Sequence, residues 1–324
     1  MNLPRRRPIP LMLVTLAVVT AATMAAYAGA RGAGHPAAAA PAATSAATAA
    51  GRLRIIRGGL VVAELTLPAR PQARRRALRR LVERLPARQV RRRGPARIVY
   101  YLDRQRLLAR ATEAVARGSD AVAAPQHAVA AAVRVPLFRQ ALRNNCETAA
   151  LSMLLAAANI RVSQLELQRQ LPHSGPLDPR PVAGGLPIWG DPDHGFVGRA
   201  AGGGTSGGFG VYPQPLQALA LRHGVRLRNL TRASAAAVYR QLLAGRPAIA
   251  WVGLSAGPYK SWQTPSGRRI TVNFGEHTVV LTGIRGDRLQ LDDPLSGRRL
   301  SWTKAQFVQL WNRLGRRTLA LTTY

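Results

Sequence analysis

Cysteine is almost absent from this chain of 324 residues, which contains a single one, Cys146. One thiol cannot form a disulfide within the chain. A structural zinc site needs about four cysteine or histidine ligands, and no second cysteine is present to help complete one. The thiol must therefore be buried as a small apolar group, paired with another chain or chemically active.

Acidic residues are also scarce. The chain has 14 Asp and Glu against 47 Lys and Arg, which gives a formal net charge of +33. Lys260 and Lys304 are the only lysines, and such a bias toward arginine is typical of a GC-rich genome. The charge predicts salt-dependent attraction to polyanions such as lipid headgroups, wall polymers or nucleic acid, and it carries no information about the fold.

A long apolar run follows the arginines of residues 5–7 near the N-terminus and ends in Ala26-Tyr27-Ala28. These features predict that residues 1–28 are a signal peptide. The run of about 20 residues is also long enough to remain as a signal anchor, with its arginine end in the cytoplasm. Both interpretations place the rest of the chain outside the cytoplasm, either secreted or anchored to the cell envelope. We expect membrane contact only through an uncleaved N-terminal segment.

Two segments of different composition follow. Residues 29–51 are rich in alanine, proline and threonine and are predicted to be a linker, because they cannot bury a core. Residues 52–120 are predicted to form a small basic α+β module. Within it, LRIIRGGLVVAELTL predicts a hairpin, PQARRRALRRLVERL predicts a helix that begins at Pro71, and ARIVYYLD predicts a third strand. The segment SDAVAAPQHAVAAAV is expected to lead into the next domain.

The module is crowded with arginines, while residues 52–110 contain only Glu64, Glu83 and Asp103 as acids. This pattern fits either a surface that binds the polyanionic envelope or a solvated basic helix face. Aromatic residues do not alternate with the arginines, so a base-stacking platform is not indicated and we expect no specific nucleic-acid partner. Propeptide, spacer and adhesion domain all remain open as roles, and we favour a spacer or wall contact.

Residues 133–324 are predicted to form the second domain. Helices come first and antiparallel strands later, which is the α+β pattern. The predicted helices are residues 145–158, 162–171, 214–223, 234–245 and 303–314, and the predicted strands are 225–230, 247–254, 268–274, 277–284 and 288–293.

The cysteine lies at the start of the first of these helices. Asn145 is a suitable N-cap residue, and the apolar periodicity begins only after it. A thiol in the first turn faces unpaired N–H groups and the positive end of the helix dipole. This position predicts that Cys146 favours the thiolate over the thiol.

A histidine and an acid lie farther along the chain. His277 begins the apolar strand HTVVLTGI, and the chain then turns and returns as LQLDDPL. A three-residue turn at 285–287 would place Asp293 opposite Val279, as a diagonal neighbour of His277 with Cβ atoms roughly 7 Å apart. A two-residue turn would instead bring back Asp292, roughly 13 Å along the strand from the histidine. We predict the first arrangement.

Five stretches together resemble a known family. They are FRQALRNNCETAALSMLL, WGDPDHGFVGR, GGFGVY, GEHTVVLTG and LDDP. Residues 133–313 thereby resemble the C39-like peptidases of the papain-like superfamily, especially the bacterial "C39-like 2" group. The resemblance implies a papain-like cysteine peptidase fold, with an N-terminal helix that carries the cysteine and an antiparallel sheet that carries the histidine and the aspartate.

The resemblance also implies roles for four residues. Cys146 would be the nucleophile, His277 its base and Asp293 the group that orients the base. The superfamily's oxyanion glutamine is matched by Gln140, which would act with the backbone N–H of Cys146. No cofactor or metal is expected. Asp191 and Asp193 lack the further acids that a calcium site requires.

We therefore expect an exported cysteine peptidase that cleaves peptide or amide bonds in peptides or proteins, including cell-wall peptides. One alternative is a catalytically inactive papain-like module that binds peptides or wall polymers, although all four implied residues are present. Another is a transferase or amidase that uses the same triad on a peptidoglycan cross-link.

Several neighbouring residues have open roles at this point. Glu276 and Asp292 adjoin the implied triad and either tune it or face solvent. Aromatic side chains of the second domain either line the groove or pack in the core, the second being the more common fate. These are Trp189, Phe209, Tyr212 and Trp251.

Overall fold

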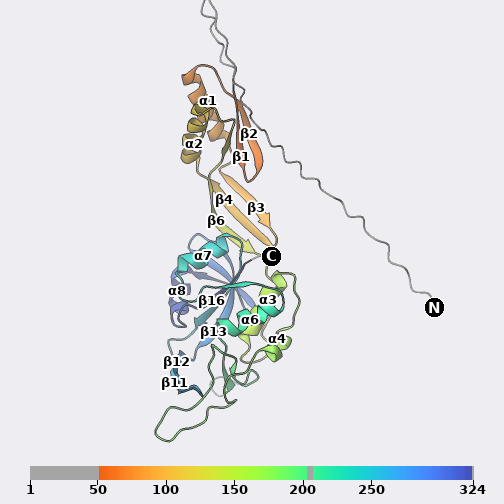
Figure 1. Cartoon of the computed structure of the whole chain (residues 1–324), viewed down its shortest axis with the longest axis vertical. Helices are drawn as coiled ribbons and strands as arrows, with labels where there is room; N and C mark the ends of the chain where they lie inside the picture. Colours follow the sequence, from red (N-terminus) through yellow and green to blue (C-terminus); the bar gives the residue numbers. More distant parts are fainter. Residues whose placement is uncertain (1–50, 203–206, 323–324) are drawn as a thin grey trace, which may run out of the picture. The chain divides into compact units, whose positions relative to one another are not determined.

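The structure of the protein is a computed structural model that describes residues 51–202 and 207–322 (Figure 1). The predicted signal segment, residues 1–28, and all of the predicted linker except Gly51 lie outside the described residues. In the described part, none of the helices has both the length and the apolar character needed to cross a membrane.

The N-terminal part contains the predicted hairpin, β1 (Arg52–Arg57) and β2 (Leu60–Thr66). Gly58 and Gly59 form its turn with φ of +61° and +82°, a backbone conformation that glycine adopts without strain. Three further elements complete this part: α1 (Pro71–Arg84), α2 (Arg104–Ala116) and β5 (Ala121–Ala123), which pairs with β1 in parallel.

These elements share a core of their own. The buried side chains come from the odd-numbered positions of β1 and from one face of each helix, as amphipathic elements require. The principal members are Leu53, Ile55, Leu78, Val82, Leu107 and Ala111.

A large antiparallel sheet joins the two halves of the chain. Its strands lie in the order β3-β4-β6-β13-β10-β16-β9, and β14 and β15 continue it from β13. The strands are β3 (Arg88–Arg93), β4 (Ala96–Leu102), β6 (Gln126–Val133), β9 (Leu227–Asn229), β10 (Ala248–Gly253), β13 (Glu276–Arg285), β14 (Arg288–Asp293), β15 (Arg298–Thr303) and β16 (Thr318–Leu321). The segment expected to lead into the second domain thus contributes β6, which bridges β4 and β13.

Helices cover both faces of this sheet in the second half of the chain (Figure 1). Ile249, Trp251 and Val280 belong to the cluster that contains α3, while the intervening residues of the same strands pack with α7 and α8. This alternation follows from the two-residue period of a strand. The helices are α3 (Cys146–Ala157), α4 (Gln164–Gln170), α6 (Pro213–Arg222), α7 (Ala235–Leu243) and α8 (Lys304–Asn312).

Short strands complete the described structure. The pair β11 (Tyr259–Gln263) and β12 (Arg269–Asn273) and the pair β7 (Val197–Gly198) and β8 (Gly208–Gly210) are both antiparallel. Mixed helices and predominantly antiparallel strands agree with the α+β composition expected from the sequence.

The β13–β14 hairpin differs from its prediction in two ways that cancel. Its turn has two residues, Gly286 and Asp287, so the predicted three-residue turn is wrong. A β-bulge between Leu281 and Gly283 adds one residue to β13, however. A bulge shifts the register by one position, and Val280 therefore pairs with Asp292. This is the same register that the longer turn would have produced.

The separate N-terminal core leads to a first prediction. Leu107 is fully buried, whereas Leu60 is 70% exposed. We expect Leu107→Ala to lower the free energy of unfolding of this part by about 2–5 kcal/mol, because it removes buried methyl groups and leaves a cavity. The matched change Leu60→Ala should stay within about 0.5 kcal/mol. Denaturant unfolding followed by circular dichroism measures both. Equal effects would show that the core is not packed as described.

Candidate active site

A small cavity of about 220 Å³ brings together three of the four residues singled out in the sequence. Gln140, Cys146 and His277 line it, and Glu276 lies on its wall as well. The rest of the lining is Arg143, Asn144, Gly208, Phe209, Leu254, Phe274 and Leu295. Asp293 lies behind the histidine and does not line the cavity.

Cys146 is the first residue of α3 and is 6% exposed. Asn145 occupies the N-cap position, but its side chain makes no capping hydrogen bond. Its Oδ1 instead accepts from the N–H of Leu142 at 2.8 Å, and its Nδ2 donates to Oε1 of Gln164 at 2.9 Å. Asn145 therefore ties the preceding loop to the neighbouring helix α4 rather than capping α3.

Two glutamates flank the thiol. The Cys146 thiol donates to Oε2 of Glu147 at 3.4 Å and lies 3.9 Å from Oε2 of Glu276. The N–H of Val211 donates to the other oxygen of Glu147 at 2.7 Å. Gly210, with φ of +121°, leaves the space that this carboxyl group occupies, since a Cβ there would collide with it. Glu147 is therefore held in a fixed position in the site. It is fully buried in the first turn of an otherwise apolar helix.

These contacts shift the pKa of the Cys146 thiol in the direction opposite to the one expected from the sequence. Burial raises the pKa of the Cys146 thiol well above its ordinary value, and the negative charges of Glu147 and Glu276 raise it further. Hydrogen bonds with Thr278 oppose this shift only in part. The prediction that the helix N-terminus makes the thiolate the favoured form is wrong for this arrangement, because desolvation and two nearby acids outweigh the helix dipole.

The two carboxyl groups are also perturbed. Burial raises the pKa of Glu147 to about 7, and its hydrogen bonds act in the opposite direction. Burial, followed by the charge of Glu147, raises the pKa of Glu276, while Arg317 acts to lower it. The pKa values of the thiol and of both carboxyl groups are therefore all raised, because burial and neighbouring negative charges disfavour the ionised forms.

His277 is held by Asp293. Its Nε2 lies 2.6 Å from Oδ1 of Asp293, and both side chains are buried. Burial alone would raise the pKa of Asp293, but hydrogen bonds from His277, Ser296 and the N–H of Leu295 prevail and lower it to about 2. The ionised carboxylate can only accept, so Nε2 donates to it. This leaves Nδ1 as the ring nitrogen free to take up a proton.

The thiol is not hydrogen-bonded to the imidazole in the described structure. Within residues 51–202 and 207–322, no hydrogen bond joins Sγ of Cys146 to His277. Oε2 of Glu276 lies beside the thiol and Nε2 of His277 bonds to Asp293, while both side chains line the same cavity as Cys146.

Gln140 lies at the cavity but is engaged elsewhere. Its Nε2 donates to the carbonyl oxygens of Leu142 and Arg143 at 2.9 and 2.8 Å. Both amide hydrogens are therefore used within the loop, and Oε1 is buried with no partner in the described part of the chain. A role in binding an oxyanion would require Gln140 to release one of these carbonyl groups.

Other residues considered in the sequence lie outside the cavity. Asp292 pairs with Nε of Arg299 at 3.5 Å and does not line the site. The aromatic side chains of Trp189, Tyr212 and Trp251 are core residues, and only Phe209 of that group reaches the cavity wall.

Glu147 was missed by sequence reasoning. Its signal is a lone acid inside an apolar helix, beside the only cysteine. Sγ of Cys146 and one oxygen each of Glu147 and Glu276 lie within 4.8 Å of one another, the spacing of metal ligands. Hydrogen bonds with Val211 and Thr278 already account for these positions, so we assign no metal.

Comparisons with known proteins find matches for the second half of the chain. Residues 133–319 match the Peptidase_C39 like family. The uncharacterized protein YvpB of Bacillus subtilis is 32% identical over 186 residues, which cover 56% of this chain and 70% of YvpB. A crystal structure of a candidate C39-like peptidase from Bacillus anthracis is 26% identical, with a TM-score of 0.52, and covers 59% of this chain and 96% of that one.

The Asp293 carboxylate leads to a second prediction. Its folded-state pKa of about 2 lies below the ordinary 3.8, so its stabilisation is present above pH 4 and is lost as the pH falls toward 2. We expect Asp293→Asn to lower the free energy of unfolding by about 2 kcal/mol at neutral pH. The difference from wild type should vanish between about pH 4 and 2, as urea unfolding at a series of pH values would measure.

Asp292 is the matched control for this experiment. Its pKa is raised, chiefly by burial, so Asp292→Asn should show the opposite trend, with the wild type gaining relative stability as the pH falls. Parallel pH profiles for the two variants would contradict the assignment of Asp293 as the histidine's partner.

Glu147 leads to a third prediction. Glu147→Gln removes the larger of the two charges that raise the thiol pKa, and the amide oxygen can still accept from Val211. We expect the alkylation rate of Cys146 by iodoacetamide to shift to lower pH, with faster reaction at neutral pH. Glu83→Gln, an exposed change far along the chain, should leave the profile unchanged. An unshifted profile in Glu147→Gln would mean that the thiol does not face this carboxyl group.

Proposed function

Because the chain belongs to the Peptidase_C39 like family, we propose that it hydrolyses peptide or amide bonds through Cys146, His277 and Asp293. One observation carries the proposal. Cys146 and His277 line a single cavity, and Asp293 bonds to the histidine nitrogen opposite the one that would accept the thiol proton. This is the order of nucleophile, base and orienting acid in thiol catalysis.

The proposed reaction proceeds in two halves. Nδ1 of His277 takes the proton of Cys146 as the sulfur attacks the substrate carbonyl carbon. The resulting oxyanion is bound by the backbone N–H of Cys146 and by Gln140. His277 then returns the proton to the leaving amine, which departs and leaves a thioester. Water, deprotonated by His277, attacks the thioester, and the acid product and the free thiol are released.

The described arrangement is best understood as a resting form. The thiol faces Glu147 and Glu276, and Gln140 is bonded to its own loop. We infer that substrate binding turns Sγ toward His277 and draws Nε2 of Gln140 into the cavity. Burial, together with Glu147 and Glu276, raises the pKa of the thiol and so favours its protonated form until this occurs.

We also propose that the protein acts outside the cytoplasm on peptides or proteins, including cell-wall peptides. The apolar run before residue 28 and the A-x-A sequence support this placement. The basic N-terminal part would serve as a spacer or a contact to the polyanionic envelope.

A second candidate function is a peptide-binding module without turnover. The raised pKa of Cys146 and the engaged amide group of Gln140 favour it. The two candidates differ in a single observable, the covalent intermediate. An epoxysuccinyl peptide should label Cys146 of the wild type in a mass spectrum if the thiol is a working nucleophile.

The fourth prediction tests the catalytic roles. Cys146→Ala should abolish cleavage of a fluorescence-quenched peptide library, and His277→Ala should lower kcat/KM by about 10³-fold or more. His127→Ala is the matched control, because this histidine is exposed on β6 and should leave the rate unchanged. Undiminished labelling and cleavage in His277→Ala would overturn the peptidase proposal.

A further inference from the structure

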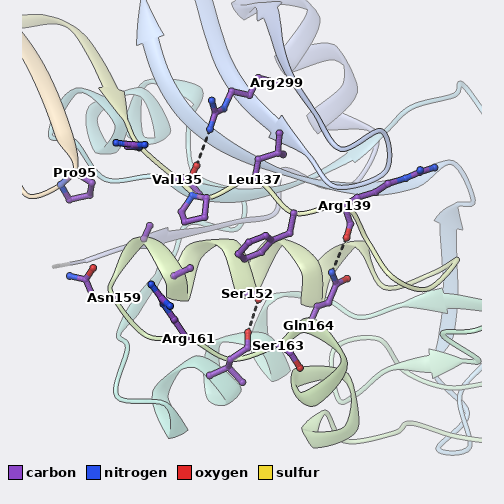
Figure 2. Close-up of a pocket in the computed structure, with 16 residues that line it drawn as sticks. Pro95, Val135, Leu137, Arg139, Ser152, Asn159, Arg161, Ser163, Gln164 and Arg299 are labelled. Atoms are coloured by element: carbon purple, nitrogen blue, oxygen red, sulfur yellow. Dashed lines mark hydrogen bonds between the residues drawn. The ribbon is translucent and has the colours of Figure 1, made fainter.

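A second and larger hollow lies apart from the catalytic cavity (Figure 2). It is a groove of about 1420 Å³, above the range of about 300–1,000 Å³ typical of small-molecule sites. We call it the arginine groove. Its lining comes from Pro95, the segment 134–139, Ser152, Ala156 and Ala157 of α3, residues 159 and 161–164 of the α3–α4 connection, and Arg299.

Four arginines line the groove, and no acidic residue does. The guanidinium groups of Arg134, Arg139 and Arg161 have no hydrogen bond or ion pair with any described residue. Arg299 alone is engaged, with Asp292 at 3.5 Å and the carbonyl oxygen of Val135 at 3.4 Å. The groove therefore presents positive charge that the described chain leaves unpaired.

The walls between these arginines are apolar. Leu137 and Val162 contribute aliphatic surface, and Phe138 keeps 37% of its surface exposed. Figure 2 shows Val135, Leu137 and Arg139 along one side of α3 and Arg161 along the other. The positive charges of the arginines are thus distributed along the apolar arginine groove and are not clustered at one end of it.

We propose that the arginine groove binds an extended peptide segment that carries both acidic and apolar side chains. Guanidinium groups pair with carboxylates in bidentate geometry, and the apolar walls bury the remaining side chains. A phosphodiester polymer would leave those walls uncovered. An anionic lipid concentrates its charge at one end and would not reach arginines on both sides of α3. A second copy of a chain with a net charge of +33 would repel the groove.

The groove is linked to the loop that carries Gln140. Oε1 of Gln164, a lining residue, accepts from the N–H of Ala141 at 2.8 Å, and its Nε2 donates to the carbonyl of Arg139 at 2.8 Å. A peptide held in the groove therefore contacts the same segment that forms one wall of the catalytic cavity. The binding site itself does not depend on the proposed hydrolysis and stands or falls separately from it.

The test uses the full chain carrying Cys146→Ala, so that binding is measured without turnover. The probe is a fluorescein-labelled peptide of alternating glutamate and leucine, followed by fluorescence anisotropy. We expect saturable binding at moderate salt, at least about tenfold tighter than for an alternating glutamate–serine peptide. The double variant Arg139→Glu, Arg161→Glu should weaken binding by at least about tenfold.

A charge-matched control distinguishes specific binding of the peptide in the groove from general attraction of the peptide to a positively charged protein. Arg226→Glu with Arg228→Glu changes two exposed arginines near β9 that do not line the groove. Equal losses in the two double variants would overturn the proposal. So would tighter, groove-dependent binding of inorganic polyphosphate or of phosphatidylglycerol vesicles than of the peptide. If the glutamate variant fails to fold by circular dichroism, Arg139→Gln with Arg161→Gln gives the same comparison.

Discussion

The ladder between β13 and β14 holds Asp293 behind His277, and the rest of the candidate site is arranged around that pair. The next residue back along β13, Glu276, lies beside the thiol of Cys146, and Glu276, His277 and Cys146 line one cavity. A one-residue slip of β14 along β13 would move Asp293 to the other face of the sheet and break its hydrogen bond with His277. The bulge at Leu281–Gly283 is therefore a structural requirement of the site.

Burial of the thiol beside two carboxyl groups gives the site its electrostatic character. Several negative charges are unfavourable in a desolvated cluster, so the pKa values of the thiol and both carboxyl groups are raised. The carboxylate of Asp293 differs because four donors stabilise its charge: Nε2 of His277, the N–H groups of Leu295 and Ser296, and Oγ of Ser296. The pKa values of Glu276 and Asp293 are thus shifted in opposite directions: burial raises that of Glu276, and hydrogen bonds lower that of Asp293.

Backbone pairing joins the N-terminal part to the second half of the chain. β6 pairs with β4 on one side and with β13 on the other, and Pro95 at the β3–β4 turn reaches the arginine groove. The N–H of Arg134 donates to the carbonyl of Pro95 at 3.1 Å, which joins the groove to this turn. The groove therefore depends on both halves of the chain, and a ligand bound there would contact each of them.

Local pattern alone determined a good part of this protein. The Gly58-Gly59 hairpin, the helix that begins at Pro71, the helix start at Cys146 and the strand after His277 all follow from short-range periodicity and turn chemistry. Family resemblance added Gln140 and agreed with Asp293, which the hairpin register had already predicted. Only the tertiary structure decided where β6 pairs, because an alanine-rich strand acquires its partners from β4 and β13. The buried Glu147 likewise needs Val211, distant in sequence, and the thiol pKa follows from that burial, which no local pattern encodes.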